Sequence, residues 1–323
     1  MNEIAAKPKV DKLVLTKLRG FCAGVVRAIE VVEQALDVCG KPVYVNHEII
    51  HNKYVVADLE KKGAITVEDL NDVPEGAWLI FSAHGVSPEE HKKAAKRGLK
   101  VIDATCPLVT KVHLEAIKYA KDGYTIILIG HIDHVETIGT MGEAPESMKV
   151  VGDVFEAQAV EVENPEKVAY LTQTTLSIDD TKTIVETLKK RFPKLKVPPK
   201  DDICYATQNR QNAVKSIESK IDLLLVLGAP NSSNSVRLRE VAEGKGTKAY
   251  LIERAADIKP EWLEDVKSLG LTASASAPEV LVQEVIDHCR REYGISEVIE
   301  DETVEENMIF SLPYELEQVI KNA

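Results

Sequence analysis

The 323-residue sequence lacks the signatures of several common protein classes. No apolar run approaches the ~20 residues that a membrane-spanning helix needs. The first residues, MNEIAAKPKVDK, contain no apolar core of a secretory signal, so we expect a cytoplasmic protein. No GxGxxG follows the first predicted strand and no GxxxxGK(S/T) occurs, so binding of nicotinamide, flavin or ATP has no support in the sequence.

Cysteine is scarce, and acidic residues outnumber basic ones. Five widely spaced cysteines, an odd number, do not form the pattern of a disulfide framework, and the absence of CxxC argues against a zinc ribbon. The formal net charge of −12 argues against a protein that binds nucleic acid or a membrane surface. An anionic substrate would therefore need a local site built from helix N-termini, hydroxyls, amides and histidines.

The pattern that is present predicts an α/β protein with parallel sheets, because short apolar runs rich in β-formers alternate with amphipathic stretches. The expected strands are Leu13–Leu18, Val43–Asn46, Trp78–Ser82, Lys100–Asp103, Thr125–Gly130, Val168–Thr172, Asp222–Gly228, Lys248–Ile252 and Leu269–Ala273. The expected helices include Val25–Leu36, Leu108–Lys121, Asp180–Arg191 and Asn212–Lys220.

Prolines and charge mark the expected boundaries. Pro193, Pro198 and Pro199 follow a predicted helix and indicate a boundary near residue 200. The tail after Ser296 is acidic and ends in the apolar segment Met308–Leu312, which we interpret as a linker followed by a docking strand. The division that we predict is a first α/β unit at 13–106, a second at 107–203, a third at 204–296 and a docking tail at 297–323.

Three cysteines, Cys22, Cys106 and Cys204, each stand where a strand-like run gives way to a predicted helix. Ligands of parallel α/β sheets lie at this edge, and helix N-termini favour the thiolate that binds metal. Three thiolates on one metal site would leave an open coordination position. A lone cysteine is more often a small buried hydrophobe, which is our interpretation of Cys39 and Cys289. Spacing does not distinguish zinc from an iron–sulfur cluster.

Polar side chains gather at the other predicted strand ends. They occur in the segments 45–52, 82–87, 130–137, 172–175, 231–235 and 274–278. Individually, Ser, Thr and Asn there are ordinary helix N-caps, and a single histidine is commonly structural. Together, they make a phosphate site with little positive charge. Glu136 is the carboxylate inside such a segment and our candidate proton donor, the alternative being a surface glutamate in a loop.

These segments resemble the 4-hydroxy-3-methylbut-2-enyl diphosphate reductase family of the non-mevalonate isoprenoid pathway. The resemblance runs from residue 19 to 278, most of the chain, and keeps the family's order. The strings that carry it are RGFCAGV (19–25), HEIIHN (47–52), FSAHGVS (81–87), DATCPLVTKVH (103–113), TQTTLS (172–177), KDDICYATQNRQ (200–211), NSSNS (231–235) and SASAP (274–278).

The resemblance implies three small α/β units around a pseudo-threefold axis with a central 4Fe-4S cluster. It assigns that cluster to Cys22, Cys106 and Cys204 and leaves one iron open for the substrate hydroxyl. It implies that Glu136 and Thr174 handle this hydroxyl and its proton, with Thr174 also contacting substrate. It implies that the diphosphate is bound by His51, His84, His134, Ser232, Ser233, Asn234 and Ser276. Electrons would come from a small redox protein such as ferredoxin or flavodoxin.

The chain departs from the family at one position. The family commonly has His-Pro-Glu where this chain has His134-Val135-Glu136, so a valine replaces the proline. The expected reaction is the reductive dehydroxylation of an allylic diphosphate to isopentenyl and dimethylallyl diphosphates. Two other classes remain open. One is an iron–sulfur hydro-lyase that works without a reductant, and the other is a cluster or zinc protein that acts as a sensor.

Overall fold

The computed structural model describes residues 8–301 and 305–322, and the chain divides into two compact units. Unit 1 comprises Met1–Cys22 and Tyr205–Met308, and unit 2 comprises Ala23–Cys204 and Ile309–Ala323. One division therefore falls between Cys204 and Tyr205, close to the boundary expected near residue 200. No helix in the described part of the chain is long and apolar enough to cross a membrane.

Unit 1 is built on a parallel sheet with the strand order β10-β9-β11-β1-β12. Its strands are β1 (Lys12–Leu15), β9 (Leu223–Leu227), β10 (Lys248–Ile252), β11 (Ser268–Ala273) and β12 (Glu297–Glu300). Its helices are α8 (Tyr205–Ile217), α9 (Ser233–Glu243) and α10 (Glu279–Tyr293), with short 3-10 turns at Glu218–Lys220, Ala255–Asp257 and Pro260–Leu263.

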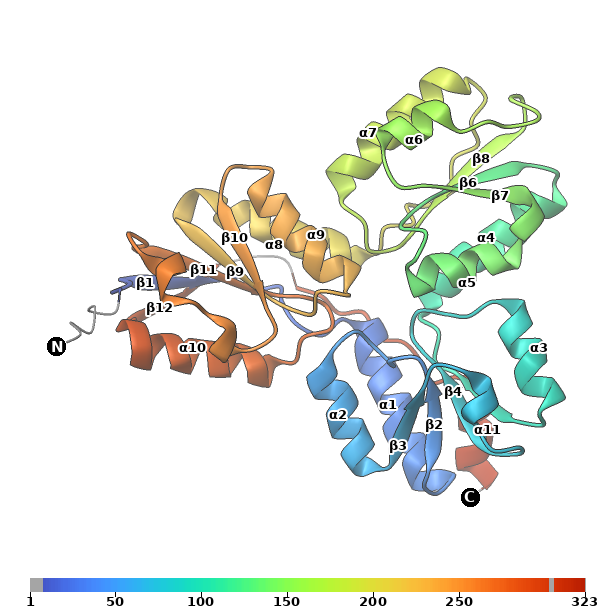
Figure 1. The fold of residues 1–323 in the computed structure, drawn as a ribbon, viewed down its shortest axis with the longest axis horizontal. Helices are drawn as coiled ribbons and strands as arrows, with labels where there is room; N and C mark the ends of the chain where they lie inside the picture. The colour runs from blue at the N-terminus through green and yellow to red at the C-terminus, as the bar shows by residue number, and fades with distance from the viewer. Residues whose placement is uncertain (1–7, 302–304, 323) are drawn as a thin grey trace. The chain divides into compact units, whose positions relative to one another are not determined.

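The two faces of this sheet are both covered, which explains the apolar runs in its strands. Successive residues of β9 alternate between the faces, so that Leu225 packs with the apolar side of α10 and Leu224 packs with α8 and α9. Figure 1 shows α10 on one face of the sheet and α8 and α9 on the other. All five residues of β9 are buried, as expected for an inner strand.

Unit 2 contains two parallel sheets. The first has the order β3-β2-β4-β5 and the second the order β7-β6-β8. The strands are β2 (Val43–Asn46), β3 (Ala64–Val67), β4 (Trp78–Phe81), β5 (Lys100–Asp103), β6 (Thr125–Ile129), β7 (Met148–Val151) and β8 (Val168–Thr172). The helices are α1 (Ala23–Val38), α2 (Lys53–Lys62), α3 (Pro88–Lys96), α4 (Pro107–Lys121), α5 (Val135–Glu143), α6 (Val154–Ala159), α7 (Ile178–Arg191) and α11 (Tyr314–Asn322), with 3-10 turns at Leu70–Asp72 and Pro145–Ser147.

The three parallel sheets confirm the predicted α/β class. Every expected strand is present, with ends shifted by a few residues, while β3, β7 and β12 were not expected. The division at 13–106, 107–203, 204–296 and 297–323 stays a prediction. One strand inside the range 13–106, β1, is hydrogen-bonded to β11 and β12, so it belongs to the sheet of the third range.

The predicted docking strand at Met308–Leu312 is wrong, because this segment forms neither helix nor strand. Ile309 is 87% exposed, so the apolar residues do not pack as a strand would require. The carbonyl of Ser311 accepts a hydrogen bond from the Arg27 guanidinium instead of from a neighbouring strand. The expected linker contributes β12 to unit 1, and α11 packs against α1 and β5 in unit 2.

Candidate active site

The three cysteines singled out from the sequence each directly precede a helix. Cys22 is followed by α1 and Cys204 by α8, while Cys106 is the N-cap residue of α4. The unpaired N–H groups and the dipole at a helix N-terminus favour a negative charge such as a thiolate. All three cysteines are partly exposed, and no disulfide joins any of the described cysteines.

The backbone holds these three cysteines in the same way. The N–H of each donates to a carbonyl in the loop that follows a strand, over 3.0 to 3.2 Å. The pairs are Cys22 with Ala275 in unit 1, and Cys106 with Ala83 and Cys204 with Thr174 in unit 2. Within residues 8–301 and 305–322, no three His, Cys, Asp or Glu side chains are grouped as ligands for a single metal ion.

The other two cysteines have a different environment. Cys289 lies in α10 and is completely buried in the apolar core of unit 1. Burial raises the pKa of its thiol to about 12, so the uncharged thiol is its stable form. Cys39 follows the end of α1, and burial raises the pKa of its thiol as well. Neither thiol is at the start of a helix.

Three histidines predicted to bind substrate lie together in unit 2, and we call them the histidine trio: His51, His84 and His134. The rings of His51 and His84 are stacked with centroids 4.1 Å apart. The His134 ring lies edge-on, 5.4 Å from the His51 centroid and 6.1 Å from that of His84. The three rings come from the loops after β2 and β4 of one sheet and after β6 of the other, and all three histidines were predicted to follow strand ends.

Two rings of the histidine trio, those of His84 and His134, are uncharged at neutral pH. Burial, followed by the charges of His51 and His131, lowers the pKa of His134 to about 4. Burial and neighbouring histidines lower the pKa of His84 well below its ordinary value. The Nδ1 atom of His134 accepts the N–H of Glu136 at 3.2 Å, so its proton is on Nε2. That buried Nε2 has no partner among the described residues and is a donor suited to an anionic ligand.

Glu136 is a buried carboxyl group paired with Thr174. Its side chain is 4% exposed, which excludes the alternative of a surface glutamate. One oxygen accepts the Thr174 N–H at 2.6 Å, and the other accepts the Thr174 hydroxyl at 3.0 Å. Burial raises the pKa of Glu136, although both contacts with Thr174 oppose that shift. A buried carboxyl with a raised pKa and a hydroxyl neighbour can hold and relay a proton.

The four predicted substrate residues of unit 1 are uncharged and buried. Ser232 is the N-cap of α9, and Ser233 and Asn234 form its first turn. The Asn234 side chain accepts the N–H of Ala275 at 2.9 Å, and the Ser276 hydroxyl lies 3.3 Å from that of Ser274. Because Ala275 also accepts the N–H of Cys22, one residue connects the Asn234 amide to that cysteine.

One buried group in unit 2 was not predicted from the sequence as part of the site. His113 lies 3.0 Å from the Glu143 carboxylate through Nδ1, and its buried Nε2 has no partner among the described residues. Gly85, at φ +78°, leaves room for this ring, since a Cβ there would meet His113 at 3.0 Å. The charge of His113 also opposes the raised pKa of Glu136. His113 is the last residue of the string DATCPLVTKVH, and this position was the only feature of the sequence that could have marked it as a site residue.

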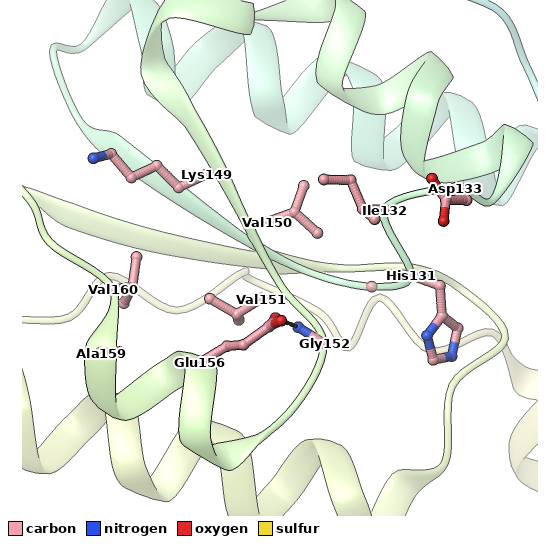
Figure 2. Close-up of a pocket in the computed structure, with 11 residues that line it drawn as sticks. His131, Ile132, Asp133, Lys149, Val150, Val151, Gly152, Glu156, Ala159 and Val160 are labelled. Atoms are coloured by element: carbon pink, nitrogen blue, oxygen red, sulfur yellow. Dashed lines mark hydrogen bonds between the residues drawn. The ribbon is translucent and has the colours of Figure 1, made fainter.

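An open cavity of about 560 Å³ lies beside β7 in unit 2 (Figure 2). It is lined by Gly130, His131, Ile132, Asp133, Lys149, Val150, Val151, Gly152, Glu156, Ala159 and Val160. Glu156 is held by the N–H of Gly152 at 2.6 Å, as the dashed line in Figure 2 marks. These lining residues include no predicted site residue, but the carbonyl of His131 accepts the N–H of His134 at 3.0 Å, so the cavity adjoins the loop that carries one histidine of the trio.

Comparison with known proteins connects these features to one family. A family model described as LytB protein matches residues 13–290. A curated relative from Pseudomonas aeruginosa (strain LESB58), named 4-hydroxy-3-methylbut-2-enyl diphosphate reductase, is 55% identical over 306 residues, 94% of this chain and 97% of the relative. A relative of the same name from Mycolicibacterium paratuberculosis is 53% identical over 98% of this chain and 95% of its own length.

Solved structures agree with the sequence comparisons. The reductase structure from Plasmodium falciparum, described as E-1-hydroxy-2-methyl-but-2-enyl-4-diphosphate reductase, has a TM-score of 0.93 at 42% identity and covers 98% of this chain and 99% of its own. A second structure, described as the terminal enzyme of the non-mevalonate pathway, has a TM-score of 0.61 at 32% identity over 87% of this chain and all of its own.

Proposed function

This chain belongs to the LytB protein family, and from that premise we propose that it reduces (E)-4-hydroxy-3-methylbut-2-enyl diphosphate to isopentenyl and dimethylallyl diphosphates. The curated relatives that carry this activity in their names support the proposal over nearly the whole chain. The observation that carries it is the Glu136–Thr174 pair, a buried acid beside a hydroxyl in the same unit as the three neighbouring histidine rings.

We infer that Cys22, Cys106 and Cys204 together hold one 4Fe-4S cluster, which when bound supplies electrons and an open iron as a Lewis acid toward the substrate hydroxyl. The chemistry of the donor set fits, because all three cysteines are at helix starts that favour thiolates. Cys39 and Cys289 are not at helix starts, and burial raises the pKa of both thiols, which supports a structural role for them.

The remaining site residues bind the diphosphate in this proposal. The Nε2–H of His134 donates to a phosphate oxygen, and His51 and His84 complete that side in unit 2. Hydroxyls and an amide of unit 1 supply further donors from Ser232, Ser233, Asn234 and Ser276. Such donors bind phosphate without the cations that this acidic chain has in short supply.

Glu136 delivers a proton to the leaving hydroxyl through the hydroxyl of Thr174. The overall reaction consumes two electrons and two protons, breaks the C–O bond, forms a C–H bond and releases water. One proton goes to the departing oxygen and the other, which we assign to the bound diphosphate, goes to an allyl carbon. The electrons arrive one at a time from a small redox protein such as ferredoxin or flavodoxin, and the reaction takes place in the cytoplasm.

The test is turnover of the anaerobically purified chain with the allylic diphosphate, with and without a one-electron reductant. We expect both product diphosphates to form only with the reductant. Consumption of substrate at an equal rate without it would identify a hydro-lyase. A protein that is not stabilised by any diphosphate compound in a thermal melt would instead be a sensor or another non-enzymatic metal protein.

A further inference from the structure

A buried arginine in unit 1 holds the backbone that leads into Cys22. Arg210 lies in α8 and is 1% exposed. Its Nε and Nη2 donate to the carbonyl of Gly20 at 3.0 and 2.7 Å, and Nη2 also reaches the carbonyl of Phe21 at 3.4 Å. Gly20 has φ +69°, and a Cβ there would meet the Ala277 carbonyl at 3.1 Å, so the loop is tightly fixed.

A second buried arginine, in unit 2, makes the equivalent contacts before Cys106. Arg27 lies in α1 and is 7% exposed. Its Nη1 donates to the carbonyls of Ala104 and Thr105, both at 3.0 Å, and its Nε donates to Ser311 at 2.6 Å. The two carbonyls belong to the two residues directly before the cysteine, as they do at Cys22.

A lysine takes this role before Cys204. Lys111 lies in α4, and its Nζ donates to the carbonyls of Lys200 and Asp201 at 2.7 and 3.4 Å. It also binds the fully buried carboxylate of Asp202 at 2.7 Å. The other Asp202 oxygen accepts the N–H of Thr172, at the end of β8, at 3.0 Å. The segment before Cys204 is thereby tied to a helix and to a strand.

The three contacts follow one order along the chain. Each cation stands five or six residues after one cysteine and binds the segment that leads into the next one. Arg27 follows Cys22 and binds before Cys106, Lys111 follows Cys106 and binds before Cys204, and Arg210 follows Cys204 and binds before Cys22. Each contact lies within a single unit. A cation binds the segment before each of the three proposed metal ligands. Among the described contacts, no cation does so before Cys39 or Cys289, so the feature accompanies the proposed ligands.

The charge of Arg27 gives this pattern a physical reason. Among the described residues, no ion pair joins Arg27 to a carboxylate; burial lowers its pKa, while the charges of Cys106, Asp103 and Glu315 oppose that shift. A buried cation without an ion-pair partner is costly unless negative groups lie near. A thiolate at Cys106 is one such group, beside the two carboxylates.

We infer that Arg27, Lys111 and Arg210 are positioning residues for the metal-binding cysteines: each fixes the backbone before one cysteine through a cationic side chain. The inference rests on the proposed function. Outer residues that orient metal ligands typically contribute about 10- to 100-fold in metal affinity or activity. A positive charge beside an iron–sulfur cluster also favours its reduced, more negative state and so raises its potential.

Lys111 is the residue to test, since its side chain is the most exposed of the three at 27%. Lys111→Met removes the charge and the donor, Lys111→Arg keeps both, and Lys118→Met removes an exposed lysine from the same helix as a control. The measurements are iron per chain after anaerobic purification, the rate of iron loss to a chelator and the midpoint potential of the bound iron.

We expect Lys111→Met to lose iron about tenfold faster than the parent chain and to show a lower potential. Lys111→Arg and Lys118→Met should match the parent in both. If Lys111→Met does not fold, Lys111→Gln, which keeps a donor without the charge, is measured in its place with the same expectation.

A folded Lys111→Met or Lys111→Gln that keeps its iron at the parent rate and at the parent potential would overturn the inference, even if it melted at a lower temperature. In that case, the proposed function would stand, because the parent chain would still contain iron. A parent chain without iron would overturn the proposed function and the inference together.

Discussion

The polar edges of the two units carry different chemistry. Unit 2 presents groups that change charge, namely the histidine trio and the buried acid Glu136. Unit 1 presents Ser232, Asn234 and their neighbours, which keep the same charge at every accessible pH. In the proposed mechanism, the proton and the pH dependence therefore come from groups of unit 2, whereas the donors that we assign to unit 1 do not titrate.

The largest loss of iron and turnover is expected when a proposed cysteine ligand is replaced, and cysteine is the ligand type that both units supply. Cys106→Ser should abolish bound iron and turnover, because a hydroxyl replaces a thiolate poorly on a soft metal cluster. Iron analysis and a turnover assay measure both. The matched control is Cys39→Ser, which should retain nearly all of each. Loss of iron in the control together with retention in Cys106→Ser would reverse the assignment.

The next largest effect is expected at Glu136 of unit 2, where a substitution should lower turnover without preventing substrate binding. Glu136→Gln keeps the size and polarity of the side chain but removes the acid, so turnover should fall by roughly 10²- to 10⁴-fold while substrate still binds. In the parent chain, turnover should fall as the pH rises through the raised pKa of Glu136, because the carboxyl then loses its proton. A variant with near-parental turnover would remove Glu136 from the mechanism.

A smaller effect tests the uncharged donors of unit 1. Ser232→Ala removes a hydroxyl proposed to face phosphate oxygens, and loss of a hydrogen bond to a charged group costs about 1.5–3 kcal/mol. Binding of substrate and of plain diphosphate, measured by calorimetry, should weaken by similar factors at every pH, with iron content unchanged. The control is Ser87→Ala, which also removes an N-cap bond of 3.4 Å, at α3, and should leave affinity intact.

Unlike the uncharged donors of unit 1, the histidine trio should make the stability and the diphosphate affinity of unit 2 depend on pH. The pKa of His134 falls from 6.5 to about 4 on folding, so the unfolded chain takes up the proton first as the pH falls. The ligand-free protein should therefore lose stability between about pH 6.5 and 4. Diphosphate favours the charged imidazole, so its affinity should rise over the same range. His134→Asn, which keeps a capping oxygen for Glu136, should reduce both slopes, and unchanged slopes would exclude His134 as their source.

The smallest effect concerns the single departure from the family. Val135 is the first residue of α5, where proline is tolerated, and His134 has ψ 134°, the extended geometry that precedes proline. Val135→Pro should thus leave turnover intact and be neutral or stabilising by up to about 1 kcal/mol in a thermal melt. Loss of both stability and turnover would show that His134 and Glu136 were placed by spacing alone.

The sequence predicted the local features of this fold better than the distant ones. Helices that begin at the three cysteines follow from local pattern, and the structure has them. The missed strands β3, β7 and β12 are four-residue edge strands with partly exposed residues, which produce no buried apolar run. The pairing of β1 with β11 joins residues more than 250 positions apart, and no local pattern encodes it.

The same limit applies to the site. Glu136 and the histidine trio were found because their side chains stand at strand ends within recognisable strings. Arg27 and Arg210 were missed because they bind backbone carbonyls, 77 and 190 positions away, which have no side-chain signature. Local strings therefore single out titratable side chains at strand ends, while the structure is needed to find buried residues that bind distant backbone.

The content of iron, acid-labile sulfide and zinc in the chain after anaerobic purification tests the proposed cluster directly. We expect iron and sulfide in equal amounts, about four of each per chain, with zinc absent. Zinc in place of iron and sulfide, or a chain that binds no metal when its five cysteines are reduced, would contradict it.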